Sequence, residues 1–276
     1  LNVTEQLKAC ERHADIDADT VNAVLDEGAK FASQVLLPLN ISGDTEGCRY
    51  DPATRAVTAP VLAAAKQAVH YAGRSGDRFL RMGTHATLAD ALHQIGLRKD
   101  ATAAFQAAET LQVERQPDFP LLYSSQGYLY CDLLLADAER AAWRCMLRSR
   151  ASGDHAAIDA CERVTERGKM MLEWRVPEDP LLDIALDYLS LGRAVLYRAI
   201  LNDAPADHTR ALLDAAVDGL RRAGQQDHLA HGLLSRAFSR TLDGCITGPD
   251  SSQEDLDEAW DIAEPGPMRL VMADVL

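Results

Sequence analysis

One pattern of leucines and small residues occurs twice in the second half of this chain, at a constant shift of 43 residues. Its members recur in the same order, as Leu191, Gly192, Val195, Leu213, Ala216 and Leu220 and then as Leu234, Ser235, Phe238, Leu256, Ala259 and Ala263. Residues three or four apart lie on one face of an α-helix, and small residues between larger ones let a second helix approach closely. The repetition therefore predicts a chain of stacked helix pairs.

A further stretch has the spacing of one complete helix pair, with members Leu88, Ala89, Leu92, Gly96, Ala101, Phe105 and Ala108. Its order, in which Leu-Ala-x-x-Leu precedes a turn glycine and then Ala-x-x-x-Phe-x-x-Ala, resembles a tetratricopeptide unit. The same shift of 43 residues links Leu62 to Phe105 and Ala65 to Ala108. Because a standard unit has about 34 residues, we expect longer connections here, at 202–208 and 243–251, where Asn, Asp, Pro and Gly gather.

A longer helix pair is expected between these units. Its first helix would span Leu121–Ala136 and its second His155–Trp174. The chain is 47% apolar but only 5% aromatic, which is typical of helices packed closely through Ala and Leu. No stretch alternates apolar and polar residues long enough to indicate a sheet. The sequence predicts an all-α fold, a right-handed superhelical stack of tetratricopeptide-like helix pairs over 61–276, preceded by a short helical segment and a loop over 1–60.

The N-terminal segment has its own pattern. Apolar residues at helical spacing predict a helix within Ile16–Asn40, with Asp19 or Thr20 as its N-cap and Pro38 at its end. A loop is expected from residue 40 to residue 60, because Gly43, Asp44, Gly47, Asp51 and Pro52 favour turns.

Two sequence runs in this segment resemble the start of a large bacterial acyl-CoA dehydrogenase, of the subgroup that includes methylthiopropanoyl-CoA dehydrogenases. They are ADIDADTVNAVLDEGAKFASQVLLPLN (14–40) and GDTEGCRYDPATRAVTAP (43–60). The resemblance implies the opening helix and loop of an FAD-dependent oxidoreductase, in which a carboxylate removes the α-proton of an acyl thioester. It ends at Pro60, so it assigns no catalytic or flavin-binding residue here. The change at Pro60 is the pattern of a fusion or a fragment.

The repeats resemble a second family. THATLADALHQIG (84–96), PLLYSSQGYLYCDLLLA (120–136), LLDIALDYLSLGRAVLYRAIL (181–201) and DLDEAWDIAEPGPMRLVMADV (255–275) are similar to the C-terminal repeats of bacterial NACHT-type NTPases. In such proteins the repeats act as the sensing or docking arm of a nucleotide switch. The phosphate-binding loop of that switch has no counterpart in this sequence.

Charge and composition exclude several function classes. The net charge of −14 argues against nucleic-acid binding, which needs clustered Lys and Arg. The arginines at 140, 144, 148 and 150 are flanked by acidic residues and are interpreted as a solvated helix face. No apolar run could span a membrane and no signal peptide is evident, so no membrane partner and a cytoplasmic location are expected.

No residue set indicates a metal, a cofactor or catalysis. The six cysteines form no CxxC and are expected to be buried thiols. The pairs His85 with His93 and His228 with His231 lack a third ligand at a motif spacing. The acid-rich segment 251–261 is interpreted as a solvated outer face, and the three tryptophans, Trp143, Trp174 and Trp260, are expected to pack between helices.

Two functions remain from the sequence. The first is a non-catalytic interaction module that holds a peptide or a partner protein on the concave face of the repeats. The residues expected there come from first helices: Thr84, His85, Tyr123, Gln126 and Arg236. The alternative is an acyl-CoA dehydrogenase-related oxidoreductase fragment, for which FAD would be the cofactor. No catalytic, cofactor-binding or metal-binding residue is assigned under the first hypothesis.

Overall fold

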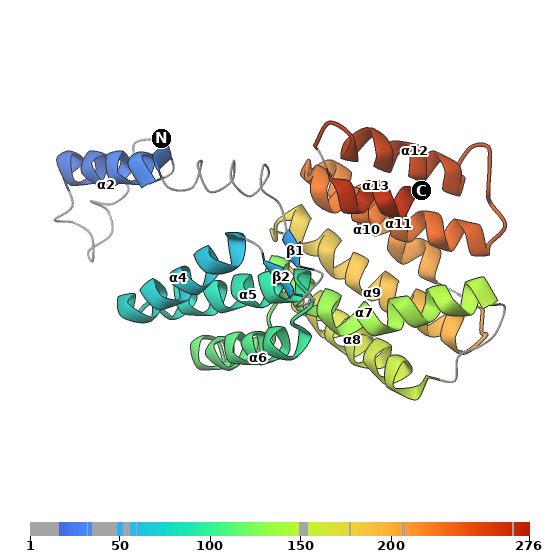
Figure 1. Cartoon of the computed structure of the whole chain (residues 1–276), viewed down its shortest axis with the longest axis horizontal. Helices are drawn as coiled ribbons and strands as arrows, with labels where there is room; N and C mark the ends of the chain where they lie inside the picture. The colour runs from blue at the N-terminus through green and yellow to red at the C-terminus, as the bar shows by residue number, and fades with distance from the viewer. Residues whose placement is uncertain are drawn as a thin grey trace.

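The computed structural model describes residues 17–31, 33–34, 49–51, 56–58, 60–148, 154–176, 178–205, 208–266 and 268–276. Eleven helices and one two-stranded hairpin form the regular structure of these residues (Figure 1). In chain order they are α2 (Ala18–Phe31), β1 (Arg49–Asp51), β2 (Ala56–Thr58), α4 (Pro60–Ser75), α5 (Arg78–Gln94), α6 (Arg98–Arg115), α7 (Ser124–Arg148), α8 (His155–Glu173), α9 (Leu181–Leu201), α10 (Thr209–Ala223), α11 (Gln226–Leu242), α12 (Ser252–Ala263) and α13 (Arg269–Val275).

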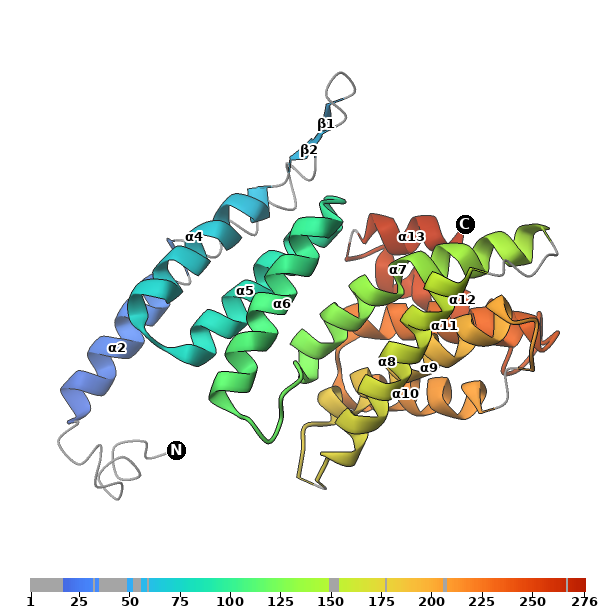
Figure 2. The ribbon, with the colours of Figure 1, turned by 90° about the horizontal axis from the view of Figure 1, so that it is seen from below.

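Helices that follow one another in the chain pack against one another. The pairs are α5 with α6, α7 with α8, α9 with α10 and α11 with α12. The second helix of each pair also contacts the first helix of the next, as α8 contacts α9 and α10 contacts α11. Figures 1 and 2 show α4 to α6 as one group and α7 to α13 as a second. The prediction of a helical fold built from adjacent helix pairs is thus confirmed.

Glycine and alanine account for the close packing within these pairs. A Cβ added at Gly192 on α9 would lie 2.8 Å from Leu213 Cδ2 on α10, and one at Gly219 would lie 2.7 Å from Ala185 Cβ. In the α5–α6 pair, Ala89, Ala101 and other residues of the predicted unit are buried. The spacing in the sequence therefore identified the contact faces, because only small residues fit where two helix backbones approach.

Two large clusters of buried apolar residues lie along the helices, and a third, small one joins α11, α12 and α13 through Ala230, Ala263 and Val271. The smaller of the two large clusters joins α5, α6 and α7 and includes Phe105, whose ring stacks on Tyr130 with 4.8 Å between centroids. The larger extends from α7 through α12 and includes Leu186 and Leu213. Leu129 and Leu134 on α7 pack against both clusters. α7 is therefore the element that links the two groups of helices.

The structure corrects two expectations for the N-terminal segment. The helix α2 is capped by Asp17, whose Oδ1 accepts a hydrogen bond from the Thr20 backbone N–H at 2.7 Å, so Asp19 and Thr20 lie inside the helix. The expected loop contains the antiparallel hairpin of β1 and β2, with Arg49 opposite Thr58. Strands of three residues are too short to give an alternating pattern. The expected helix end at Pro38 lies outside the described residues.

The first helix of the longer pair differs from its expected bounds, whereas the second agrees. α7 continues past Ala136 to Arg148, because Ala138, Ala141 and Ala142 extend its buried face. α8 covers the expected range to within one residue. Among the helices of the described residues, none is long and apolar enough to cross a membrane.

Candidate binding groove

A groove of about 740 Å³ lies along α13 and the first helices α7, α9 and α11, with Leu256 of α12 also in its lining. We call it the inner groove. The side chains that matter for its chemistry are acidic, basic and aromatic: Glu139, Trp143, Arg193, Tyr197, Phe238 and Asp274. They come from four helices that are separated in sequence and are brought together by the stacking of the pairs.

An ionic network between α7 and α9, centred on the buried Arg193, lies at the inner groove. Arg193 donates hydrogen bonds to Asp132 Oδ1 at 2.7 Å and to Glu139 Oε2 at 3.1 Å. The Tyr197 hydroxyl donates to Glu139 Oε1 at 2.9 Å. Burial raises the pKa of Asp132, but the Arg193 guanidinium more than offsets this effect and holds that pKa below its ordinary value. Because both carboxylates contact Arg193, its charge is compensated within the chain.

An aromatic pair forms one wall of the inner groove. Trp143 on α7 stacks on Phe238 on α11, with 4.1 Å between ring centroids and 7° between ring planes. Trp143 is nevertheless 46% exposed. The expectation that the tryptophans pack between helices is therefore correct for only part of the Trp143 side chain. Exposed aromatic surface beside a groove is typical of an interaction site.

A carboxylate from the end of the chain also lines the inner groove. Burial, together with the negative charge of Glu139, raises the pKa of Asp274 on α13. Glu139 already contacts Arg193, and Arg140 at the rim contacts Asp137 at 2.6 Å. Asp274 thus adds negative charge to a place where the nearby guanidinium groups are engaged by other carboxylates.

The five residues predicted to bind a partner lie on α5, on α11 and on or just before α7. Thr84 and His85 lie half-buried on α5, and burial lowers the pKa of His85. The Tyr123 hydroxyl donates a hydrogen bond to Gln116 Oε1 at 2.9 Å, and Gln126 lies half-buried in the first turn of α7. None of the five is among the residues that line the inner groove, and their role stays a prediction.

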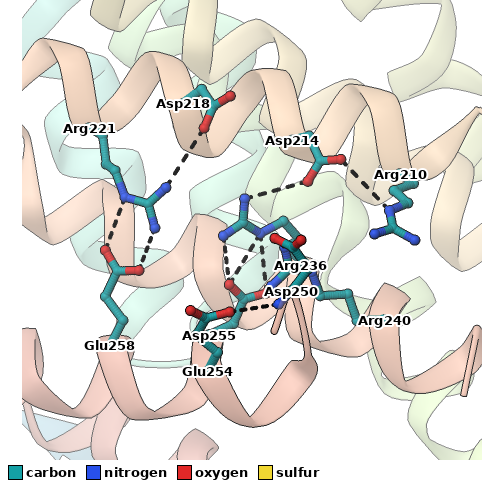
Figure 3. Close-up of a pocket in the computed structure, with 10 residues that line it drawn as sticks. All are labelled: Arg210, Asp214, Asp218, Arg221, Arg236, Arg240, Asp250, Glu254, Asp255 and Glu258. Carbon is teal, nitrogen blue, oxygen red and sulfur yellow. Dashed lines mark hydrogen bonds and ion pairs between the residues drawn. The ribbon is translucent and has the colours of Figure 1, made fainter. Parts of the chain in front are cut away.

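Arg236 lies in a separate charged cleft between α10, α11 and α12, which Figure 3 shows. It is buried and donates through Nη2 to Asp255 Oδ1 at 2.6 Å. Arg240 Nη1 lies 3.0 Å from Asp255 Oδ2, and Arg221 pairs with Glu258. The interpretation of segment 251–261 as a solvated face is wrong for Asp255 and Glu258, which form ion pairs between helices. We call this set the charged cleft.

The other residue classes of the sequence are placed as follows. Cys131, Cys145 and Cys161 are buried free thiols as predicted, whereas the free thiol of Cys245 is only half-buried; Cys10 and Cys48 lie outside the described residues. In the part of the chain that the structure describes, no group of three or more His, Cys, Asp or Glu could hold a metal ion. Of the arginine cluster, those at 140 and 144 are exposed, as a solvated helix face requires.

No family model, no curated protein and no solved structure matches this chain. The resemblances to acyl-CoA dehydrogenases and to NACHT-type repeats thus stay predictions from the sequence. The inner groove was missed from sequence because Trp143 lies beyond the expected end of its helix at Ala136. The one signal that could have found it is the apolar face that continues through Ala138, Ala141 and Ala142.

Proposed function

We propose that this chain is a tetratricopeptide-like interaction module that binds a segment of a partner protein in the inner groove. The helix pairs would form a right-handed superhelical stack, whose first helices line the concave face. Three observations support the proposal: the 43-residue recurrence, the packing of helices in adjacent pairs, and a groove along α13 and the first helices α7, α9 and α11. Stacked repeats of this kind present extended surfaces to partner segments.

The observation that carries the proposal is the half-exposed Trp143 stacked on Phe238. Aromatic side chains contribute large contact area, and truncation of a central Trp costs binding free energy of about 2 kcal/mol or more. An apolar side chain of the partner would pack on this pair. It would displace water from the exposed part of the Trp143 ring.

Charge selects the rest of the partner segment. Arg193 is compensated by Asp132 and Glu139 and Arg140 by Asp137, so Asp274 is the carboxylate among the described groove residues that adds negative charge. The whole chain has a net charge of −14. Complementary charge favours association and excludes partners of like charge. The partner segment is therefore a basic one, with a Lys or Arg close to a Leu- or Phe-like side chain.

Binding of short synthetic peptides, followed by fluorescence anisotropy, tests this function. Peptides with Lys or Arg beside Leu or Phe are expected to bind, and matched peptides with Glu in place of the basic residue are not. Trp143→Ala should weaken binding by about tenfold or more, and Asp274→Asn should weaken it less. Leu147→Ala is the control, because Leu147 is exposed on the same helix but does not line the groove.

Two results would count against the proposal. Equal binding of basic and acidic peptides would remove the argument from charge, and equal binding by the Trp143→Ala and native chains would remove the groove as the site. The same preparation, incubated with FAD and freed of unbound ligand, is expected to be colourless. Retained flavin absorbance would favour the oxidoreductase hypothesis instead.

A further inference from the structure

An apolar stripe runs along α4, with exposed residues at its two ends and half-buried alanines between them. Its members are spaced by three, four and three residues, which places them on one side of the helix: Val61, Ala64, Ala68 and Tyr71. Val61 is 51% exposed and Tyr71 is 56% exposed. The neighbouring side of α4, with the buried Ala65 and Ala72, faces the protein as α4 packs on α5. The stripe is thus a second apolar side of the same helix, which α5 covers only in part.

The repeat pattern explains why α4 has two apolar sides. The shift of 43 residues aligns Leu62 with Phe105 and Ala65 with Ala108, so α4 occupies the place that α6 has in the next pair. α6 is a second helix, and it packs both on its own first helix, α5, and on the following helix, α7. α4 packs on the following helix, α5, in the same way. A first helix on its other side is therefore expected.

The helix α2 has the properties of that missing first helix. Val21, Leu25 and Ala29 follow one another at intervals of four residues, on one side of the helix. Leu25 is 63% exposed, and Figure 1 shows α2 apart from α4. A helix of 14 residues is marginal in water unless an apolar face is covered. The chain between Phe31 and Pro60 is long enough for α2 to reach α4.

We propose that α2 docks on the Val61–Ala64–Ala68–Tyr71 stripe and forms the first helix of the pair that α4 completes. Leu25 would lie over Ala64 and Ala68, where small side chains leave room for it, and Val61 and Tyr71 would flank the contact. The helical stack then begins at α2 rather than at Pro60. The N-terminal segment becomes part of the repeat domain instead of a separate unit.

A second copy of the chain is the competing occupant of the stripe. α2 is favoured because it is tethered to α4, so its effective concentration at the stripe far exceeds that of a separate molecule in dilute solution. The two occupants differ in one measurable way. Coverage by α2 is independent of protein concentration, whereas coverage by another copy is lost on dilution.

Hydrogen exchange of the full chain, read by mass spectrometry, tests the proposal. If α2 is docked, its amides exchange at least tenfold more slowly than those of the same segment as a free peptide. Leu25→Gln should remove this protection, and so should Tyr71→Gln, which lies on the other helix. Gln matches Leu in helix propensity, so a loss reports the contact. Ala23→Gln and Lys66→Gln, which place the same side chain on the opposite sides of α2 and α4, are the controls and should leave protection unchanged.

Each other outcome overturns the proposal. α2 amides that exchange as fast as the free peptide would show that the helix is not docked. Protection that survives Tyr71→Gln would show that α2 is held elsewhere. Protection that disappears when the protein is diluted tenfold would assign the stripe to a second copy of the chain.

Discussion

At the scale of single residues, one guanidinium group is shared by three carboxylates at the start of α9. Arg175 lies 2.6 Å from Asp187, 3.5 Å from Asp179 and 3.9 Å from Asp183. Asp187 is 1% exposed. Burial raises the pKa of Asp187 from 3.8 to about 6, and Arg175 only partly opposes this effect. One positive charge cannot fully compensate three negative charges in a partly buried site.

The raised pKa of Asp187 predicts how the free energy of unfolding changes with pH. Between pH 3.8 and about 6, the folded chain binds a proton at Asp187 more readily than the unfolded chain does. The contribution of Asp187 to the free energy of unfolding therefore rises as pH falls through this window and decreases again as pH rises. Other carboxylates titrate too, so the native chain is compared with Asp187→Asn by urea unfolding at about pH 4.5, 5.5 and 7. The difference between the two chains should shift in favour of the native chain as pH falls, and a constant difference would contradict the shifted pKa.

At the scale of helices and their contacts, the charged cleft joins α10, α11 and α12 by ion pairs that differ in burial. Asp255 is buried between Arg236 and Arg240, whereas the pair of Arg221 with Glu258 is partly exposed. Burial raises the pKa of Asp255 above its ordinary value, and Arg236 and Arg240 only partly offset this effect. Figure 3 shows the Asp255 carboxylate beside the Arg236 and Arg240 side chains. The Asp255 carboxylate thus lies between two positively charged guanidinium groups that are largely shielded from solvent.

Removal of Asp255 should therefore cost far more than removal of Glu258. Asp255→Ala removes the carboxylate that both buried guanidinium groups share and leaves Arg236 with Asp214 and Arg240 with Asp250, and a broken buried ion pair costs about 3–5 kcal/mol of unfolding free energy. Glu258→Ala removes a partly exposed pair and leaves Arg221 with Asp218 at 3.7 Å, so it should cost less than about 1 kcal/mol. Urea unfolding of both variants gives the comparison, with the exposed Asp257→Ala as a control. Equal losses of unfolding free energy in Asp255→Ala and Glu258→Ala would show that the ion pairs of Asp255 stabilise the fold no more than surface pairs do.

The same contacts show what the sequence could and could not predict about elements. The faces of α5, α6, α9 and α10 follow from residue spacing, because packing demands small and apolar residues at fixed intervals. The ion-pair partners of Asp255 cannot be predicted from residue spacing, because they depend on how far α12 is shifted along α11. The inner groove was missed for a related reason. Its members come from five helices, and only their stacking brings Trp143 next to Phe238.

At the scale of the whole molecule, the helices fall into two groups that meet at α7. The smaller apolar cluster belongs to α5, α6 and α7, and the larger one extends from α7 to α12. The length of α7 was underestimated from sequence because its alanine-rich extension has no large apolar residue before Trp143. That extension contributes Ala138, Ala141 and Ala142 to the larger cluster. A chain with this organisation need not unfold as one cooperative unit, because each helix pair contacts mainly the pairs next to it.

The two groups of helices are therefore expected to unfold locally at different free energies. The smaller cluster buries fewer side chains, so α4 to α6 should exchange their amide protons through an opening of lower free energy than α9 to α12. Phe105→Ala removes the ring that contacts Tyr130 and costs about 3–5 kcal/mol locally. Native-state hydrogen exchange of this variant should show lost protection in α5 and α6 and unchanged protection in α9 to α12. Leu213→Ala, in the larger cluster, should instead lower the protection of α9 and α10. An even loss throughout the chain in the Phe105→Ala variant would show that α7 couples the two clusters into one unit, and the inner groove would then be no more stable than the N-terminal helices.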